Sequence, residues 1–209
     1  MHDAVIVACM PAVKTLTPDV RARLTELAAQ LLDGEGVAAL TLRQLATRAG
    51  TSTMAVYTLF GDKHGLLAAV YEQGFARLGA ALEAELDQHE DPVEDLAALG
   101  RAYRAAALGS PRVYALMFSD AGPEFEPDPH ARAVADATFA PLVRAVARCQ
   151  AAGELIGNDA ERTALHLWAV AHGMVSIELA GPPARVAVDA ALAYEESLVF
   201  AVWPFLAPG

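Results

Sequence analysis

Cysteine is scarce in this chain, which has only Cys9 and Cys149 among 209 residues. Two cysteines so far apart do not make a disulfide framework, so we expect a cytoplasmic protein kept in a reducing environment. The chain also lacks a run of about 20 apolar residues, the length of a membrane-spanning helix. The apolar run at residues 4–10 is shorter and has no basic leader, so we expect neither a signal peptide nor a membrane partner.

The groupings of residues on which catalysis and metal binding depend are missing as well. No cysteine, histidine and carboxylate side chains fall at the spacing of zinc ligands. The chain has no glycine-rich phosphate loop, no nucleophile elbow and no paired carboxylates in an apolar setting. We therefore expect no metal site, no cofactor and no enzymatic activity.

An excess of basic residues, the usual mark of a nucleic-acid-binding protein, is absent overall, since the net charge is −11. The distribution is uneven, however. Residues 1–77 contain seven basic and seven acidic residues, whereas the remainder contains eight basic and nineteen acidic residues. Within residues 41–63, Arg43, Arg48 and Lys63 stand against Asp62 alone. We expect a locally basic head that can approach phosphate groups, attached to an acidic body that repels them.

Apolar residues make up 55% of the chain, alanine is abundant, and β-branched runs are few, which predicts an all-α protein with a sizeable core. Periodic apolar positions, caps and breakers predict helices over residues 17–35, 41–49, 52–60, 62–86, 91–109, 110–118, 129–152, 158–181 and 184–203. Pro141 predicts a kink or break within the 129–152 helix. Asn158 is the expected cap of the helix that follows, and residues 120–129, with three prolines, are expected to form a loop.

Residues 40–63 carry the most specific pattern in the sequence. Thr41 and Gln44 have the spacing of a capping box, and Gly50 supplies a left-handed residue that ends the first short helix. Ser52 or Thr51 can cap the next helix, whose outward residues are small and hydroxylated. Two short helices joined in this way predict a helix-turn-helix that can enter the major groove of DNA.

This segment, with the Tyr-x-x-Phe of residues 57–60 and the lysine at position 63, resembles the DNA-binding domain of TetR-family transcriptional regulators. The resemblance implies a three-helix helix-turn-helix domain over residues 17–75 and a helical regulatory and dimerisation domain over residues 76–209. Residues 1–16 are expected to be a poorly ordered N-terminal extension, either upstream of a true start at Met10 or a short arm that carries Lys14. In that family, the fourth helix connects the two domains. A three-helix fragment of an ordinary helical domain is the alternative interpretation.

The resemblance also implies which residues contact DNA. Thr41, Tyr57 and Lys63 are expected to contact phosphates, and Thr53, Met54 and Ala55 are expected to contact base edges. Arg43, Ser52 and Thr58 complete the expected interface. Many relatives have glycine and threonine where this chain has Met54 and Ala55, and histidine is common in place of Thr58. The resemblance therefore does not define the DNA sequence that is bound.

In the second part of the chain, the last two helices are apolar over more surface than one core needs, and the resemblance implies that they form a four-helix interface in a homodimer. Trp168, His172 and Gly173 resemble the Trp-His-Gly signature of one TetR-family C-terminal domain type. Trp168 and His172 are four residues apart and share a helix face. They either line a ligand pocket or form a structural pair, in which case Gly173 allows another helix to approach closely.

Several large side chains of the body are expected to surround a common interior: Tyr103, Tyr114, Met117, Phe118, Phe139, Trp168 and His172. They predict a pocket for a small, mostly apolar or aromatic molecule, and a dry packed core is the alternative. The sequence therefore predicts a ligand-responsive regulator, a repressor that a small effector releases from a pseudo-palindromic DNA operator. The rival interpretations are a DNA-binding protein that is insensitive to ligands, and a helical small-molecule-binding protein or enzyme with a vestigial helix-turn-helix.

Overall fold

A computed structural model describes residues 18–118, 125–181 and 189–207. The predicted N-terminal extension over residues 1–16, and Thr17 at the start of the first predicted helix, lie outside these ranges. The described residues form α-helices with one short 3₁₀ turn, and their only bridge pairs Leu155 with Leu206, so the all-α prediction is confirmed. None of the helices in these ranges is long and apolar enough to cross a bilayer.

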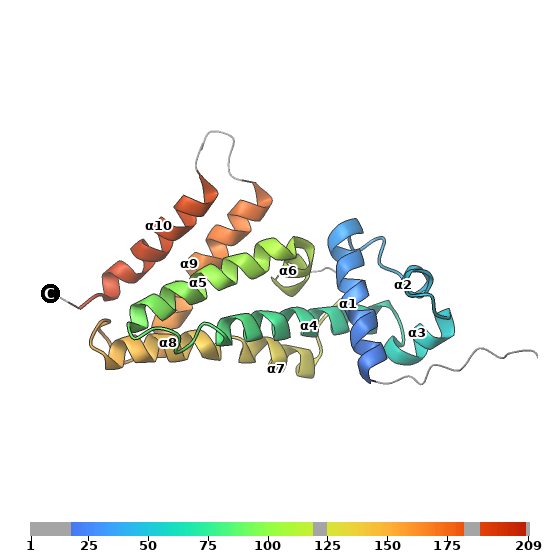
Figure 1. The fold of residues 1–209 in the computed structure, drawn as a ribbon, viewed down its shortest axis with the longest axis horizontal. Coiled ribbons are helices and arrows are strands. Elements are labelled where there is room, and N and C mark those ends of the chain that lie inside the picture. The colour runs from blue at the N-terminus through green and yellow to red at the C-terminus, as the bar shows by residue number, and fades with distance from the viewer. Residues whose placement is uncertain (1–17, 119–124, 182–188, 208–209) are drawn as a thin grey trace, which may run out of the picture.

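The helices form two groups, at opposite ends of an elongated molecule (Figure 1). The first group comprises α1 (Pro18–Glu35), α2 (Leu42–Ala49) and α3 (Thr53–Phe60). Helix α4 (Lys63–Glu83) starts beside this group and extends into the second. The second group contains α5 (Pro92–Gly109), α6 (Pro111–Phe118), α7 (Pro129–Ala137), α8 (Ala140–Ala151), α9 (Ala160–Ala180) and α10 (Ala190–Val202), followed by a 3₁₀ turn at Trp203–Phe205.

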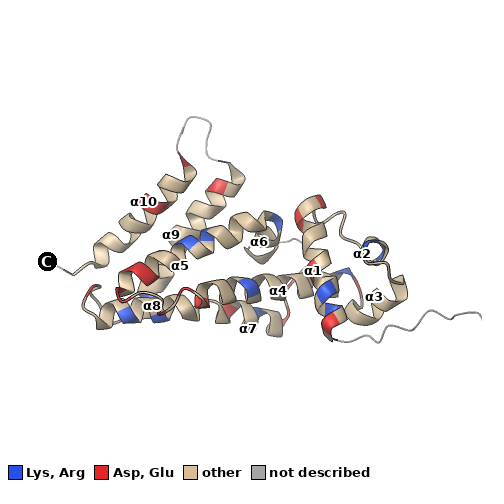
Figure 2. Ribbon diagram, in the orientation of Figure 1, with Lys and Arg blue, Asp and Glu red and all other residues tan. Residues whose placement is uncertain are grey.

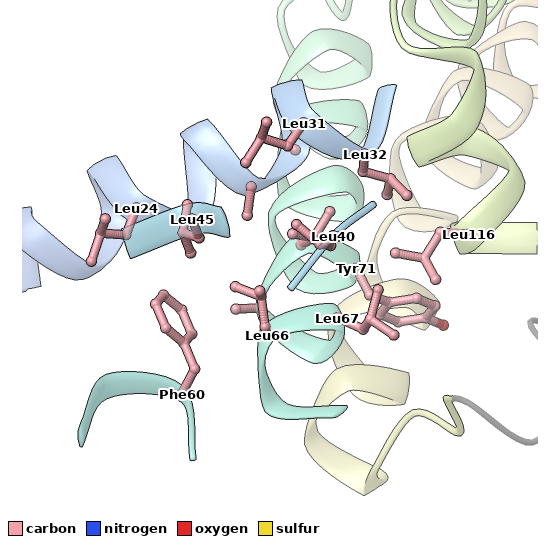
Figure 3. Close-up of a cluster of buried hydrophobic side chains, with 14 of the residues drawn as sticks. Leu24, Leu31, Leu32, Leu40, Leu45, Phe60, Leu66, Leu67, Tyr71 and Leu116 are labelled. Atoms are coloured by element: carbon pink, nitrogen blue, oxygen red, sulfur yellow. The ribbon is translucent and has the colours of Figure 1, made fainter. Parts of the chain in front are cut away.

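Helix α4 contributes to both hydrophobic cores of the molecule. Leu66 and Leu67, near its start, are fully buried among Leu24, Leu45 and other side chains of α1 and α2 (Figure 3). Leu78, further along the same helix, is buried in the second core with side chains of α5, α8 and α9. Because a single continuous helix supplies both cores, the two groups of helices are mechanically connected.

Several helix boundaries differ from the sequence prediction, among them the end of α4, which lies at Glu83 and not at residue 86. The predicted 129–152 helix is broken, as Pro141 indicated, but the break lies at Thr138 and Phe139, and Pro141 occupies the first turn of α8. This position suits proline because an N-terminal turn leaves its N–H groups unpaired. The predicted cap of α9 at Asn158 is wrong, because the Asp159 carboxylate accepts the hydrogen bond from the Arg162 N–H. Helix α10 is described from Ala190, with Asp189 as its cap, and the predicted start at residue 184 lies outside the described residues.

The turn between α4 and α5 is organised by a buried carboxylate. Asp95 has no exposed surface and accepts hydrogen bonds from the backbone N–H groups of Asp87 and His89, both at 2.9 Å. It also bonds to the His89 ring and to the Arg148 guanidinium of α8. Burial by itself raises the pKa of Asp95, but these hydrogen bonds and the Arg148 charge outweigh it and hold the pKa below its ordinary value. The ionised carboxylate thus fixes α5 against α4 and α8.

Candidate nucleic-acid interface and buried cavity

The predicted helix-turn-helix forms with the expected turn. Gly50 has φ 62° and ψ 36°, a left-handed conformation, and its N–H donates to the carbonyl groups at the end of α2. Ser52 caps α3 by accepting a hydrogen bond from the Ala55 N–H at 3.1 Å. Thr41 likewise caps α2, but the reciprocal half of the capping box is wrong. The Gln44 side chain donates to the Glu35 carboxylate of α1 at 2.8 Å instead of reaching back to Thr41.

Gly65 fixes the position of α3 against α4, a role that the sequence did not reveal. A β-carbon at this position would lie 2.0 Å from the carbonyl oxygen of Phe60, the last residue of α3. Only a residue without a side chain therefore allows the first turn of α4 to approach the end of α3 this closely. Asp62 tightens the same junction, because its carboxylate accepts a hydrogen bond from the Gly65 N–H at 2.9 Å.

The outer face of α3 is the most exposed part of the first domain. Val56 and Phe60 are buried, whereas Met54 is 74% exposed and Tyr57 is 50% exposed. All of the residues predicted to contact DNA reach the surface: Thr41, Arg43, Ser52, Thr53, Met54, Tyr57 and Thr58 are exposed, and Ala55 and Lys63 are half-buried. The structure thus leaves all nine predicted residues accessible to solvent.

The hydroxyl groups on this face are not equivalent. Those of Thr41 and Ser52 cap helices as acceptors, which leaves their protons available to a phosphate oxygen. The Thr58 hydroxyl donates to the Met54 carbonyl at 2.9 Å. Within the described part of the chain, the Thr53 side chain makes no hydrogen bond, so both its donor and its acceptor capacity are available to a base edge.

Basic residues lie on α1 and α2 at this end of the molecule, with acidic residues among them (Figure 2). Arg43 is exposed on α2, and Lys63 lies in the first turn of α4. Arg48 pairs with Glu35 at 2.5 Å and is therefore partly neutralised. The sequence did not single out Arg21, whose guanidinium lies 5.2 Å from the centre of the Phe60 ring, beside the end of α3.

The second domain encloses a cavity of about 740 Å³, bounded by parts of α4 to α10. Five of the residues predicted to bind a small molecule line it: Tyr103, Met117, Phe118, Phe139 and Trp168. Tyr114 and His172 do not line it, and instead lie behind Tyr103, to which both are hydrogen-bonded. The sequence missed the contribution of α4, whose Tyr71, Phe75, Leu78 and Leu82 form one wall. Their helical spacing indicates burial but does not distinguish a cavity wall from packed core.

Tyr103, Tyr114 and His172 form a closed polar cluster. The two tyrosine oxygens are 2.8 Å apart, and Nδ1 of His172 lies 3.0 Å from the Tyr103 oxygen and 2.7 Å from the Tyr114 oxygen. Burial raises the pKa of both tyrosines and lowers that of His172, so all three side chains are neutral near pH 7. Of the three, only Tyr103 lines the cavity, and its hydroxyl is bonded to the two residues that do not.

Gly173 does not allow close packing within one chain, contrary to one interpretation of the Trp-His-Gly segment. A β-carbon there would have no described atom within 4 Å. Trp168 and His172 do share a face, as predicted, with ring centres 5.3 Å apart. The close helix approaches lie elsewhere: a β-carbon at Gly100 of α5 would lie 2.6 Å from Leu198 of α10, and one at Gly74 of α4 would lie 2.7 Å from Met117 of α6.

Two connections join the cavity walls to the first domain. At the start of α6, the Arg112 N–H donates to the Asp33 carboxylate of α1 at 2.8 Å, and the Arg112 guanidinium donates to the Asp33 carbonyl. Before α7, the His64 ring is 3.1 Å from the Glu126 carbonyl through Nε2, and Phe125 packs against both His64 and Tyr71. Helices α6 and α7 both line the cavity, so these contacts connect its walls to the helix-turn-helix domain.

Comparison with known proteins gives a consistent result. Residues 24–70 match the family model described as bacterial regulatory proteins, tetR family, and residues 96–200 match the model described as tetracyclin repressor-like, C-terminal domain. That second description does not mention a Trp-His-Gly signature, so the narrower resemblance stays a prediction. No curated protein sequence matches the chain significantly.

Among solved structures, a protein with unknown function from Rhodococcus sp. RHA1 is 34% identical, with a TM-score of 0.74 over 90% of this chain and 96% of that chain. The TetR-family transcriptional regulator PfmR from Thermus thermophilus is 22% identical, with a TM-score of 0.66 over 87% of this chain and 97% of that chain. A TetR/AcrR-family transcriptional regulator from Thermobifida fusca is 20% identical, with a TM-score of 0.67 over 88% and 97%. The last two likenesses concern the fold.

The contact at Gly65 generates a direct prediction. Gly65→Ala forces the start of α4 away from the Phe60 carbonyl, and we expect it to lower the free energy of unfolding by about 1–3 kcal/mol, as overpacking does. Urea unfolding followed by circular dichroism measures this loss. Gly34→Ala is the matched control, because a β-carbon at Gly34 meets nothing within 4 Å. Equal stability of the two variants would show that α3 is not held by this approach.

Proposed function

Because the chain belongs to the TetR family of bacterial regulatory proteins, we propose that it is a homodimeric transcriptional repressor that a small, mostly apolar effector releases from DNA. The observation that carries the proposal is that α4 supplies one wall of the cavity and, at its other end, the seat of α3. Binding to chromosomal DNA places the protein in the cytoplasm. The proposal has three parts: docking on DNA, dimer assembly and release by a ligand.

The docking part rests on the outer face of α3. We propose that this helix enters the major groove and that Thr53, Met54 and Ala55 contact base edges, while Thr41, Tyr57 and Lys63 contact phosphates. The exposure of Met54 and Tyr57 and the unoccupied hydroxyl of Thr53 among the described residues support this assignment. Arg43, Ser52 and Thr58 flank the same face, and Arg21 extends its basic rim.

The assembly part rests on the exposed apolar side chains of α9 and α10. Leu165, Ala169, Gly173 and Ile177 recur every four residues along α9, with Leu165 54% exposed and Ile177 51% exposed. The exposed large side chains of α10 and the turn that follows it are Leu192, Val199, Phe200 and Trp203. Contiguous exposed apolar surface of this kind marks an interaction site. The small side chains at positions 169 and 173 would let α9 of a second copy approach closely.

The release part of the proposal rests on the connection between the cavity and the helix-turn-helix domain. Tyr71 and Phe75 line the cavity on α4, Met117 lines it on α6, and Asp136 lines it on α7. A ligand that binds better to one orientation of these helices than to another shifts the population toward that orientation. In the favoured orientation, the two helix-turn-helix domains of a dimer would be separated by a distance that does not fit DNA. The affinity for DNA then falls by the factor by which the ligand prefers that orientation.

The experiment that tests the whole proposal has two stages. Duplex DNA bound by the protein is first selected from a random pool, and we expect a pseudo-palindrome whose half-sites are about 34–36 Å apart or a multiple of that distance. Metabolites are then screened for release of the protein from that DNA. A chain that selects no sequence would favour a small-molecule-binding protein with a vestigial helix-turn-helix, and a complex insensitive to every compound would favour a non-regulatory DNA-binding protein.

The docking geometry predicts two different phenotypes. Lys63→Ala should weaken binding to all duplexes alike and reduce the slope of log affinity against log salt by about one unit, as the loss of one phosphate contact does. Thr53→Ala should instead change the preference between DNA sequences. Fluorescence anisotropy over a range of salt concentrations measures both effects. Arg101→Ala removes an exposed positive charge from the body and is the control; an equal effect of the Lys63 and Arg101 substitutions would contradict this docking.

The exposed stripe on α9 predicts an effect on assembly. Ala169→Glu places a charge in the middle of the stripe, and we expect it to give monomers with weak DNA binding because a buried unpaired carboxylate is costly at an interface. Light scattering at micromolar concentration measures the mass. Ala147→Glu on the exposed side of α8 is the matched control and should remain dimeric. A wild-type protein that is monomeric under these conditions would rule the interface out.

The cavity predicts that Trp168 can be truncated without loss of the fold. Trp168 is half-buried at the cavity wall, so Trp168→Ala enlarges an existing space, and we expect a cost well below the about 3–5 kcal/mol of removing a large side chain from a packed core. The variant should bind DNA but not respond to the effector found in the screen. Val146→Ala, in the packed core away from the cavity, should lose stability and keep the response. Unfolding of the Trp168 variant would favour the dry-core interpretation.

A further inference from the structure

We propose that the cavity selects lipophilic cations, that is, compact aromatic or apolar molecules that carry one positive charge. This inference rests on the proposed ligand response and adds a charge requirement to it. It is drawn from the charged and aromatic side chains that line the cavity, and from the absence of basic ones among the described lining residues.

Both charged residues that line the cavity are acidic. Asp136 projects from α7 and Glu195 from α10, and no described lysine or arginine lines the cavity. Neither carboxylate forms a hydrogen bond or ion pair with another described residue. Both carboxylates are exposed to solvent in the single chain. They therefore act as fixed negative charges at the cavity rim, and they favour a ligand that brings the opposite charge.

An arginine close to each of these carboxylates is paired with another acid. Arg132, one helical turn before Asp136, pairs with Glu126 at 2.7 Å. Arg104 forms a bidentate bond with Glu178 at 2.6 and 2.8 Å, and this bond, with a smaller contribution from Glu195, raises the pKa of the guanidinium. Because each arginine is already paired with another acid, its positive charge does not neutralise Asp136 or Glu195. An anionic ligand would thus meet two carboxylates and no available cation.

The aromatic side chains of the cavity walls are also suited to a cation. Tyr71, Phe75, Phe118, Phe139 and Trp168 line the cavity, and aromatic ring faces attract cations through their quadrupoles. The volume of about 740 Å³ accommodates a drug-sized molecule. A compact aromatic cation therefore satisfies the apolar surface and the charge together. A neutral ligand satisfies only the apolar surface.

The test uses three probes of similar shape and different charge: tetraphenylphosphonium, neutral triphenylphosphine oxide and tetraphenylborate. Isothermal titration calorimetry of the full chain at low salt should give an affinity for the phosphonium about tenfold or more above that for the borate. This preference should shrink as salt is added, because the two carboxylates are exposed and screened. Equal or tighter binding of the borate would overturn the inference, as would the absence of binding by all three probes.

Substitutions then locate the charge preference. Asp136→Asn combined with Glu195→Gln should lower phosphonium affinity by about fivefold or more and leave the neutral probe unaffected. Glu196→Gln is the matched control, because Glu196 is exposed on the same helix but does not line the cavity. If the double variant does not fold, the same titrations are carried out on the two single variants. A cation preference that survives both single substitutions would overturn the inference.

Release from the selected DNA is recorded in the same samples, which separates this inference from the proposed function. If only the neutral or the anionic probe binds and releases DNA, the ligand response stands and the charge requirement falls. If the phosphonium binds with the expected carboxylate dependence but DNA stays bound, the charge requirement stands and the ligand response to this class falls.

Discussion

The continuity of α4 is the constraint on which the rest of the structure depends. At 1.5 Å per residue its 21 residues extend about 30 Å, the diameter of a small domain. Its first turns are fixed in the first core by Leu66 and Leu67, and its later turns are fixed in the second core by Leu78 and Leu82. A helix packed at both ends moves as one body, so the seat of α3 at Gly65 cannot be independent of the cavity wall at Tyr71 and Phe75. The other connections, through Arg112 and His64, run parallel to this helix.

Local chemistry explains why much of the fold could be predicted from the sequence. The helix-turn-helix depends on signals within a few residues of one another, such as the Ser52 cap and the left-handed Gly50, and these signals act before tertiary contacts form. The errors arise where tertiary structure chooses between local options. Asn158 and Asp159 are adjacent and equally able to cap, so the sequence does not decide between them. The side chain of Gln44 could reach back to Thr41 but instead donates a hydrogen bond to Glu35, which the fold brings close from α1.

The candidate sites could be predicted unequally, for the same reason. The outer face of α3 follows from helical periodicity, because a residue not needed by the core is left outside. The cavity does not follow in this way, since Tyr71 and Phe75 have the same apolar periodicity whether they pack against a neighbour or line a void. The sequence also does not show which residues of a cluster reach the cavity. Tyr103, Tyr114 and His172 share one polar cluster, but only Tyr103 lines the cavity. In the sequence, Gly65 and Gly100 are only residues of low helix propensity. The structure shows that Gly65 faces the Phe60 backbone and Gly100 faces the Leu198 side chain.

The uneven charge of the chain limits how a ligand can act. The excess of eleven negative charges lies after residue 77, so the body is repelled by DNA and only the near-neutral first domain can approach it. A cationic ligand in the body would reduce this repulsion and, through electrostatics alone, would strengthen DNA binding. Release by such a ligand must therefore come from a change in geometry carried by α4, α6 or α7, and the coupling free energy must exceed the electrostatic gain. Because that gain acts between exposed charges, added salt screens it, whereas a coupling carried by packed helices is retained.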